Sequence, residues 1–199
     1  MLNRPGHPIR NTMDGFDFSF QPSLDRSVMD DLMTMTYIHN NKNVVFLGPP
    51  SVGKTHLSIA LGMGAIMSDI PVYYTSAMKL VQTLKRDYDL KRLEYRIRTN
   101  SRFRLMIADE IGYLPLTREE SNLFFQFGSF GYEKCSTIYT SNKSFSEWGE
   151  ILGVQVMAAA VLDLILHHCV VVNIRGESYR LNDRRKNSLP TERRVEKSE

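Results

Sequence analysis

The chain has little of what would place it in several common protein classes. Its 199 residues include only two cysteines, Cys135 and Cys169, which are too few and too far apart for a disulfide or metal framework and which fit a reducing cytoplasm. No apolar run reaches the ~18 residues of a transmembrane helix. The segment from Met1 to Pro8 lacks the apolar centre of a signal peptide. The sequence therefore predicts a cytoplasmic protein without a membrane partner.

The chain also lacks a strong excess of charge, since its formal net charge is only +3. Overall charge therefore gives no sign of nucleic-acid binding, but the distribution of cations does. Between positions 79 and 104 only Asp87, Asp89 and Glu94 oppose a cluster of basic residues. Its members are Lys79, Lys85, Arg86, Lys91, Arg92, Arg96, Arg98, Arg102 and Arg104. Such a cluster is typical of a phosphate-contacting patch or, equally, of a solvated helix face.

The most informative motif that is present is a phosphate-binding loop. Residues 48–55 fit the pattern G-x-x-x-x-G-K-[ST], with an apolar run before them and a helix-competent stretch after them. The glycines let backbone N–H groups point at phosphate oxygens, and the following helix N-terminus favours anions. Lys54 can reach the β- and γ-phosphates of a nucleotide, and the Thr55 hydroxyl can ligate Mg²⁺. We expect the nucleotide to contact Gly48, Pro49, Pro50, Ser51, Val52, Gly53, Lys54, Thr55 and His56.

Two further strand ends carry polar side chains suited to nucleotide hydrolysis. The apolar run that begins at Phe103 ends in Asp109 and Glu110. Because ligands of open α/β sheets bind at the carboxyl ends of strands, Asp109 is placed to hold Mg²⁺ and Glu110 to polarise an attacking water. A later strand ends in Asn142, which is either a contact to the γ-phosphate or attacking water or an ordinary turn residue. Together these residues favour hydrolysis over transfer to a small molecule.

The order of predicted elements indicates one α/β domain, a P-loop NTPase three-layer sandwich with a parallel sheet. We expect an extended arm over residues 1–25 whose aromatic residues dock on the core, the domain itself over 26–182, and a charged, disordered tail over 183–199. The helices are predicted at 26–41, 54–68, 77–98 with a break near 87–89, 117–133 and 154–168. The strands are predicted at 43–48, 71–75, 103–109, 136–141 and 170–174.

The sequence around and between these motifs resembles the IstB-like ATP-binding proteins. These proteins are the AAA+ helper ATPases of transposons, and they are related to the DnaC helicase loaders. The resemblance runs over about residues 14–182. Seven segments carry the resemblance. The first four are Phe-Asp-Phe at 16–18, Gln-Pro-Ser-Leu-Asp at 21–25, the loop at 48–57 and Asp-Glu-Ile-Gly-Tyr-Leu-Pro-Leu at 109–116. The others are Thr-Ser-Asn at 140–142, Phe-Ser-Glu-Trp-Gly at 145–149 and Ile-Arg-Gly-Glu-Ser-Tyr-Arg-Leu at 174–181.

The resemblance implies a role for each part of the site. Lys54 and Thr55 would form Walker A, and Asp109 and Glu110 would form Walker B. Asn142 would be sensor 1, and Arg180 a sensor-2-like arginine near the γ-phosphate. Such proteins use ATP and Mg²⁺, assemble as homo-oligomers on DNA, and recruit or activate the transposase of the same element. The basic region falls where related initiator ATPases carry a DNA-contacting insertion.

Several features depart from the family pattern. The matching part begins almost at the first residue, so the usual preceding helical domain is expected to be absent. Leu164 follows Asp163 where an arginine is usual, and Gly131 also stands where an arginine is typical. An arginine finger is worth roughly 10³–10⁵ in hydrolysis rate. Both changes therefore predict impaired hydrolysis in an oligomer. Ser51 replaces a usual glycine, which matters if residue 51 requires a positive φ.

These observations leave several functions to compare. The first is an ATP-dependent helper of transposition that remodels DNA and regulates the transposase. A DnaC-like helicase loader shares the motifs, but grips the helicase through an N-terminal domain. A nucleotide-switched DNA binder with little hydrolysis is favoured by Leu164 and Gly131. A small-molecule kinase would need a substrate lid and a base near the acceptor, and the sequence indicates neither.

Overall fold

The computed structural model describes residues 11–100, 102–112, 115–132 and 134–182. Its centre is a five-stranded sheet in the order β2-β3-β4-β1-β5, and the strand pairs are all parallel. The strands are β1 Asn43–Leu47, β2 Val72–Ser76, β3 Leu105–Ile111, β4 Ser136–Ser141 and β5 Cys169–Asn173. The sheet confirms the predicted parallel α/β fold, and it brings the carboxyl ends of β1, β3 and β4 to one edge.

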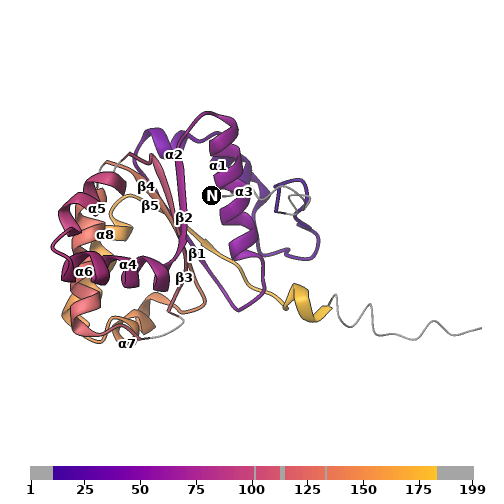
Figure 1. The fold of residues 1–199 in the computed structure, drawn as a ribbon. Helices are drawn as coiled ribbons and strands as arrows, with labels where there is room; N and C mark the ends of the chain where they lie inside the picture. The colour runs from indigo at the N-terminus through magenta and orange to yellow at the C-terminus, as the bar shows by residue number, and fades with distance from the viewer. Residues whose placement is uncertain (1–10, 101, 113–114, 133, 183–199) are drawn as a thin grey trace, which may run out of the picture.

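Helices cover both faces of the sheet, which gives the predicted three-layer sandwich (Figure 1). One face carries α1 Arg26–Met33 and α3 Lys54–Met67. The other face carries α4 Ala77–Asp89, α6 Arg118–Gly131 and α8 Gln155–Leu166. The remaining helical elements are α2 Thr36–His39, α5 Leu93–Asn100, the 3₁₀ turn η1 Phe145–Glu147 and α7 Trp148–Ile151.

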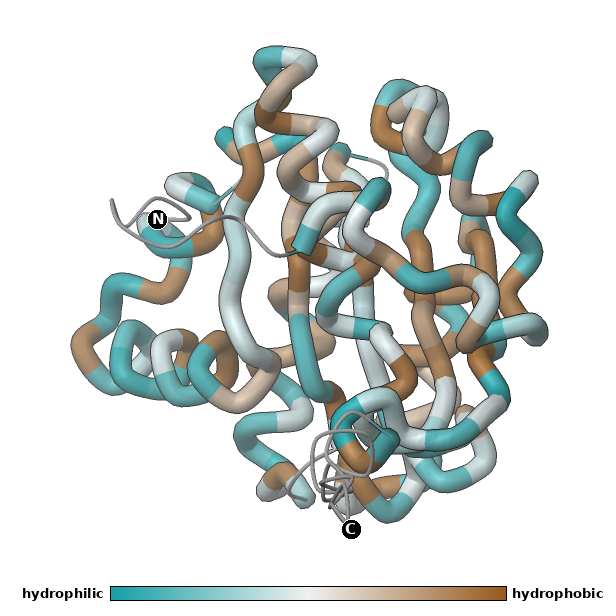
Figure 2. Tube along the Cα trace, turned by 90° about the vertical axis from the view of Figure 1, so that its right-hand side faces the viewer, coloured by the Kyte–Doolittle hydropathy of each residue, from teal (hydrophilic) through white to brown (hydrophobic). Residues whose placement is uncertain are grey.

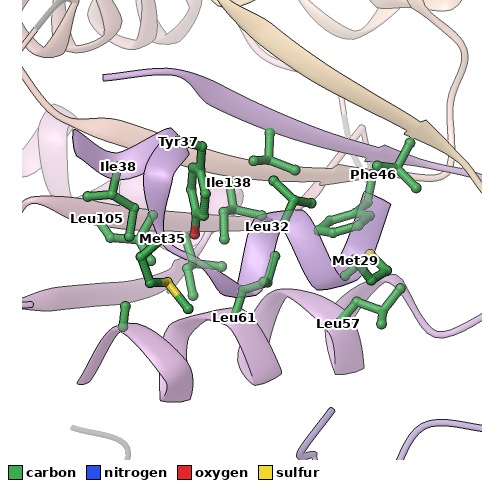
Figure 3. Close-up of a cluster of buried hydrophobic side chains, with 14 of the residues drawn as sticks. Met29, Leu32, Met35, Tyr37, Ile38, Phe46, Leu57, Leu61, Leu105 and Ile138 are labelled. Carbon is green, nitrogen blue, oxygen red and sulfur yellow. The ribbon is translucent and has the colours of Figure 1, made fainter. Parts of the chain in front are cut away.

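The strand residues alternate between two hydrophobic clusters, one on each face of the sheet. In β1, Val44 and Phe46 join the cluster beneath α1 and α3, whereas Val45 and Leu47 join the cluster beneath α4, α6 and α8. Figure 3 shows the first cluster, where Phe46 lies with side chains of α1 and α3. Figure 2 shows hydrophobic residues along the segments at the centre of the trace, and hydrophilic residues are common in the outer helices and turns. Burial on both faces explains why the central strands are continuously apolar.

Two predicted elements differ from the structure. The helix predicted over 26–41 is divided into α1 and α2, because Met35 has a left-handed backbone with φ 61° and the Thr34 hydroxyl bonds the carbonyl of Asp31. The strand predicted to end at Asp109 continues to Ile111 through a bulge. The break expected near 87–89 is confirmed by the separation of α4 from α5.

The described part of the N-terminal arm, residues 11–25, forms successive turns instead of the extended conformation that we predicted. Hydrogen bonds such as Phe16 N–H to the Met13 carbonyl, 3.1 Å, close these turns. The predicted docking of aromatic residues is confirmed, since Phe16 and Phe18 pack against the cluster beneath α1 and α3. Residues 1–10 and the predicted tail, 183–199, lie outside the described residues.

Candidate functional site

The loop over residues 48–55 connects β1 to the N-terminus of α3, as its motif predicts. Two glycines are required by close approaches. A Cβ on Gly48 would lie 2.2 Å from the Ile174 carbonyl oxygen, and a Cβ on Gly53 would lie 2.5 Å from the Phe16 ring. Gly53 also has φ 103°, which L-residues with side chains rarely adopt. The loop is therefore held tightly between the arm and the segment after β5.

Lys54, the first residue of α3, turns its side chain back over this loop. Its Nζ donates to the carbonyl oxygens of Gly48 at 2.6 Å and Pro49 at 2.7 Å. Burial lowers the pKa of the Lys54 amine, and attraction to Asp109 and Glu110 acts in the opposite direction. A cationic donor thus lies directly beside the loop, an arrangement suited to phosphate.

The two predicted metal ligands lie together. The Thr55 hydroxyl is 3.0 Å from Oδ1 and 3.1 Å from Oδ2 of Asp109, whose side chain comes from the end of β3. Asp109 is only 4% exposed, whereas the adjacent Glu110 is exposed. A carboxylate and a hydroxyl are hard oxygen donors, the kind that Mg²⁺ prefers, and the residues present therefore fit this ion.

The remaining predicted residues lie around the loop. The Gly48 N–H donates to the Ser141 carbonyl at 3.2 Å, so the exposed Asn142 follows directly after a contact with the loop. The Tyr179 N–H donates to the Ser51 carbonyl at 3.0 Å, and the exposed Arg180 is the next residue. The fold thus brings both segments to the loop, although no contact of either side chain with it occurs among the described hydrogen bonds.

His56 belongs to the arm side of the site. Its Nε2 lies 2.8 Å from the Thr12 carbonyl oxygen, and its ring meets the Phe16 ring edge-on with centroids 5.4 Å apart. The arm is in turn fixed to the segment after β5, because the Ser23 hydroxyl donates to the Arg175 carbonyl at 2.7 Å and accepts from the Arg175 N–H at 2.8 Å. Both chain ends of the described domain therefore pack around the loop.

Two residues that sequence reasoning missed contact the buried carboxylate. The Tyr74 hydroxyl of β2 donates to Asp109 Oδ2 at 2.9 Å, and the Thr140 hydroxyl of β4 donates to Asp109 Oδ1 at 2.5 Å. Thr140 adjoins a strand end that the sequence did single out. Tyr74 carries no such signal, because its proximity to Asp109 depends on β2 being the neighbour of β3.

Comparison with known proteins identifies the group to which this site belongs. The family model described as "IstB-like ATP binding protein" matches residues 2–187. The chain belongs to this family of IstB-like ATP-binding proteins. It is 46% identical over 184 residues to a protein named as an ATP-binding protein of insertion sequence IS21 from Pseudomonas aeruginosa, a match covering 92% of this chain and 69% of the relative. The corresponding IS5376 protein of Geobacillus stearothermophilus is 44% identical, with 89% and 71% covered.

Solved structures support the parallel α/β fold of the IstB-like chain. The DnaC helicase loader matches with a TM-score of 0.62 at 23% identity, covering 75% of this chain and 91% of that one. AMPPCP-bound DnaA from Aquifex aeolicus matches with a TM-score of 0.68 at 18% identity, covering 89% and 54%. At these identities the likeness concerns the fold. In the described part of the IstB-like chain, no helix has both the length and the apolar character needed to cross a membrane.

The backbone conformation at Ser51 bears on our expectation that a glycine is usual at this position. Ser51 has φ 62°, so residue 51 does adopt the left-handed conformation that glycine tolerates best. We expect Ser51→Gly to raise the free energy of unfolding by about 0.5–1 kcal/mol, because relief of the left-handed strain exceeds the added entropy of the unfolded chain. Urea unfolding measures the change. Ser51→Ala is the control and should give no gain; equal stability of the Gly and Ala variants would contradict this explanation.

The two positions where the resemblance led us to expect arginines are Leu164, within α8, and Gly131, the last residue of α6. Leu164 of α8 is half-buried, and a Cβ on Gly128 of α6 would lie 2.8 Å from its Cδ2 atom. A Cβ on Gly131 would lie 3.2 Å from the Cys135 sulfur. Leu164 therefore contributes to the close packing of α6 on α8.

The basic region of the IstB-like chain is partly neutralised by its own acids. Arg96 pairs with the buried Asp87. The other pairs are Lys85 with Glu119 at 3.3 Å, Arg98 with Glu94 at 2.6 Å and Arg86 with Asp87 at 3.7 Å. Among the described residues, no salt bridge is found for five exposed cations of this region: Lys79, Lys91, Arg92, Arg102 and Arg104. The surface available for phosphate is therefore smaller than the sequence suggested.

Proposed function

We propose that this IstB-like chain is an ATP-dependent helper of DNA transposition that hydrolyses ATP with Mg²⁺, binds duplex DNA and regulates the transposase of its element. The observation that carries the proposal is the contact between the Thr55 hydroxyl and Asp109, 3.0 Å, beside Lys54. This contact joins the two motifs that nucleotide hydrolysis needs. The relatives named as insertion-sequence ATP-binding proteins support the biological context.

Each side chain then has a role that its chemistry supports. Lys54 and the backbone N–H groups of the loop would bind the β- and γ-phosphates, and Thr55 with Asp109 would hold Mg²⁺. Bound there, Mg²⁺ would neutralise charge on the phosphate oxygens. The exposed Glu110 would orient and deprotonate the attacking water. Asn142 and Arg180 would contact the γ-phosphate from the neighbouring strand end and from the segment after β5.

A second candidate is a nucleotide-switched DNA binder with little hydrolysis. The observation that favours it is Leu164, an apolar residue that packs on α6 where the IstB-like pattern has an arginine. A leucine cannot neutralise charge on a neighbouring subunit's nucleotide. This candidate keeps ATP binding and DNA binding but predicts little turnover.

Steady-state ATP turnover of the purified chain, with and without duplex DNA, separates the two candidates. A DNA-stimulated rate that disappears in Lys54→Ala supports the helper ATPase. ATP and DNA binding with no turnover above that variant supports the switch. A chain that binds no ATP would overturn both.

The DNA part of the proposal predicts a salt-dependent effect at Arg92, in the connection between α4 and α5. Arg92→Ala should weaken duplex binding and lower the slope of log affinity against log salt by about 1, because one phosphate contact is lost. Arg26→Ala is a matched control, since this exposed arginine lies on α1, on the other face of the sheet. Fluorescence anisotropy over a salt series measures both. Equal slopes in the two variants would place the DNA surface elsewhere.

A further inference from the structure

The buried carboxylate of Asp109 is surrounded by hydroxyl groups from three different elements. Oδ1 accepts from Thr140 at 2.5 Å, Oδ2 accepts from Tyr74 at 2.9 Å, and the Thr55 hydroxyl lies 3.0 and 3.1 Å from the two oxygens. Asp109 is 4% exposed, and no salt bridge to it occurs within the described ranges. Since a buried carboxylate needs hydrogen-bond partners, these donors satisfy its oxygens and fix their position.

The three donors differ in what they do when a cation enters. Thr55 would turn its oxygen toward Mg²⁺ and so change its own bonding. Tyr74 and Thr140 come from β2 and β4, the two strands on either side of β3, and they are not needed as ligands. These two hydroxyls therefore keep the carboxylate in place while Thr55 is engaged.

Strand register explains how Tyr74 reaches the carboxylate. Tyr74 pairs with Ile107, and Asp109 is the next residue of β3 on the same face. A diagonal neighbour of this kind lies within reach of a long aromatic side chain.

Thr140 also controls the backbone of Glu110. Ala108 pairs with Tyr139 and Ile111 with Ser141, so two residues of β3 oppose the single Thr140 of β4. At this bulge the Glu110 N–H donates to the Thr140 hydroxyl at 2.8 Å, and Glu110 has a left-handed φ of 63°. Asp109 is consequently buried while Glu110 is exposed. One hydroxyl thus connects the two carboxylate residues.

We infer that Tyr74 and Thr140 are positioning residues, which hold Asp109 for Mg²⁺ and, through Thr140, direct Glu110 outward. This inference rests on the proposed function of the site. Neither residue has to touch the nucleotide. Their loss should therefore act on the Mg²⁺ dependence of ATP binding and leave metal-free binding by the loop intact.

The test measures ATP affinity in EDTA and over a Mg²⁺ titration. In Tyr74→Phe the Mg²⁺ concentration giving half of the affinity gain should rise about tenfold, because a hydrogen bond to a charged group is lost. Tyr73→Phe is the matched control: Tyr73 pairs with Met106 on the opposite face and packs on Phe103 with ring centroids 5.3 Å apart. Affinity in EDTA should be the same in both variants.

Thr140 gives an independent arm of the same experiment. Thr140→Val keeps the shape but removes the hydroxyl, and should shift the Mg²⁺ titration and lower kcat. Thr140→Ser restores the hydroxyl and should restore both. If the valine variant does not fold, as judged by its thermal melt, Tyr74→Phe decides alone. Identical Mg²⁺ titrations in Tyr74→Phe and Tyr73→Phe would overturn the inference, whereas a wild-type chain that binds no ATP would overturn the proposed function together with it.

Discussion

Replacing Lys54 with alanine should weaken ATP binding by roughly 100-fold or more. The Lys54 amine bonds two loop carbonyl oxygens at 2.6 and 2.7 Å, and it would exchange these partners for phosphate oxygens when ATP binds. Hydrogen bonds to charged groups are worth about 1.5–3 kcal/mol each, and two of them correspond to at least this loss of affinity. Titration calorimetry with ATP and Mg²⁺ measures the change directly.

A matched variant separates this effect from a general change in charge. Lys79→Ala removes the same charge from an exposed position on α4 and should leave the ATP affinity unchanged. Thermal stability provides a second readout, because a ligand at about 100 times its Kd stabilises the folded state by about 2.7 kcal/mol. At that ATP concentration Lys79→Ala should be stabilised by about this amount, whereas Lys54→Ala should gain at most about 0.4 kcal/mol. Equal stabilisation of both variants would exclude Lys54 from the nucleotide site.

The parts of this site that could be predicted from sequence are those encoded by local patterns. The loop over residues 48–55 carries its glycines, lysine and threonine in one short stretch, and an apolar strand followed by two acids marks residues 109 and 110. The rule that parallel strands present their carboxyl ends at one edge then predicts that Thr55 and Asp109 approach each other, and they do, at 3.0 Å.

The parts that sequence reasoning missed depend on contacts between distant segments. Tyr74 reaches Asp109 only because β2 is the neighbour of β3, and no local pattern gives that order. At the bulge, the Glu110 N–H donates to the Thr140 hydroxyl in place of a backbone carbonyl oxygen, and no local pattern predicts this bond. The helix break at Met35 likewise follows from a single left-handed residue, which periodicity does not reveal.

Charge patterns were similarly incomplete as predictors. The basic stretch from 79 to 104 was predicted to be largely helical, and it does lie on α4, α5 and the residues next to them. How many of its cations remain unpaired depends on which acidic side chains fold against it. Glu119 comes from α6 and pairs with Lys85, a contact that linear spacing does not show. The structure therefore reduces the cations available to a DNA backbone and makes Arg92 a better target than the paired Arg96.

Glu110→Gln should lower kcat for ATP by about 100-fold or more while ATP affinity stays within about twofold. Glutamine keeps the size of the side chain but cannot accept the proton of the attacking water, and general base catalysis contributes typically 10²–10⁴-fold. The Glu110 N–H bond to the Thr140 hydroxyl, 2.8 Å, involves the backbone and survives the substitution, so the bulge remains. Affinity is retained because Lys54, Thr55 and the loop backbone are unchanged. Single-turnover hydrolysis and ATP titration measure the two quantities separately.

Glu150→Gln makes the same chemical change at an exposed position of α7 and should leave kcat unaltered. The pair of variants also tests the outward direction of Glu110, because a general base must reach a water beside the γ-phosphate. If kcat is unchanged in Glu110→Gln while Lys54→Ala abolishes turnover, another group activates the water. If turnover is absent in the wild type as well, Glu110 has no reaction to catalyse, and the packing of Leu164 against α6 becomes the structural reason to regard the chain as a nucleotide-switched DNA binder.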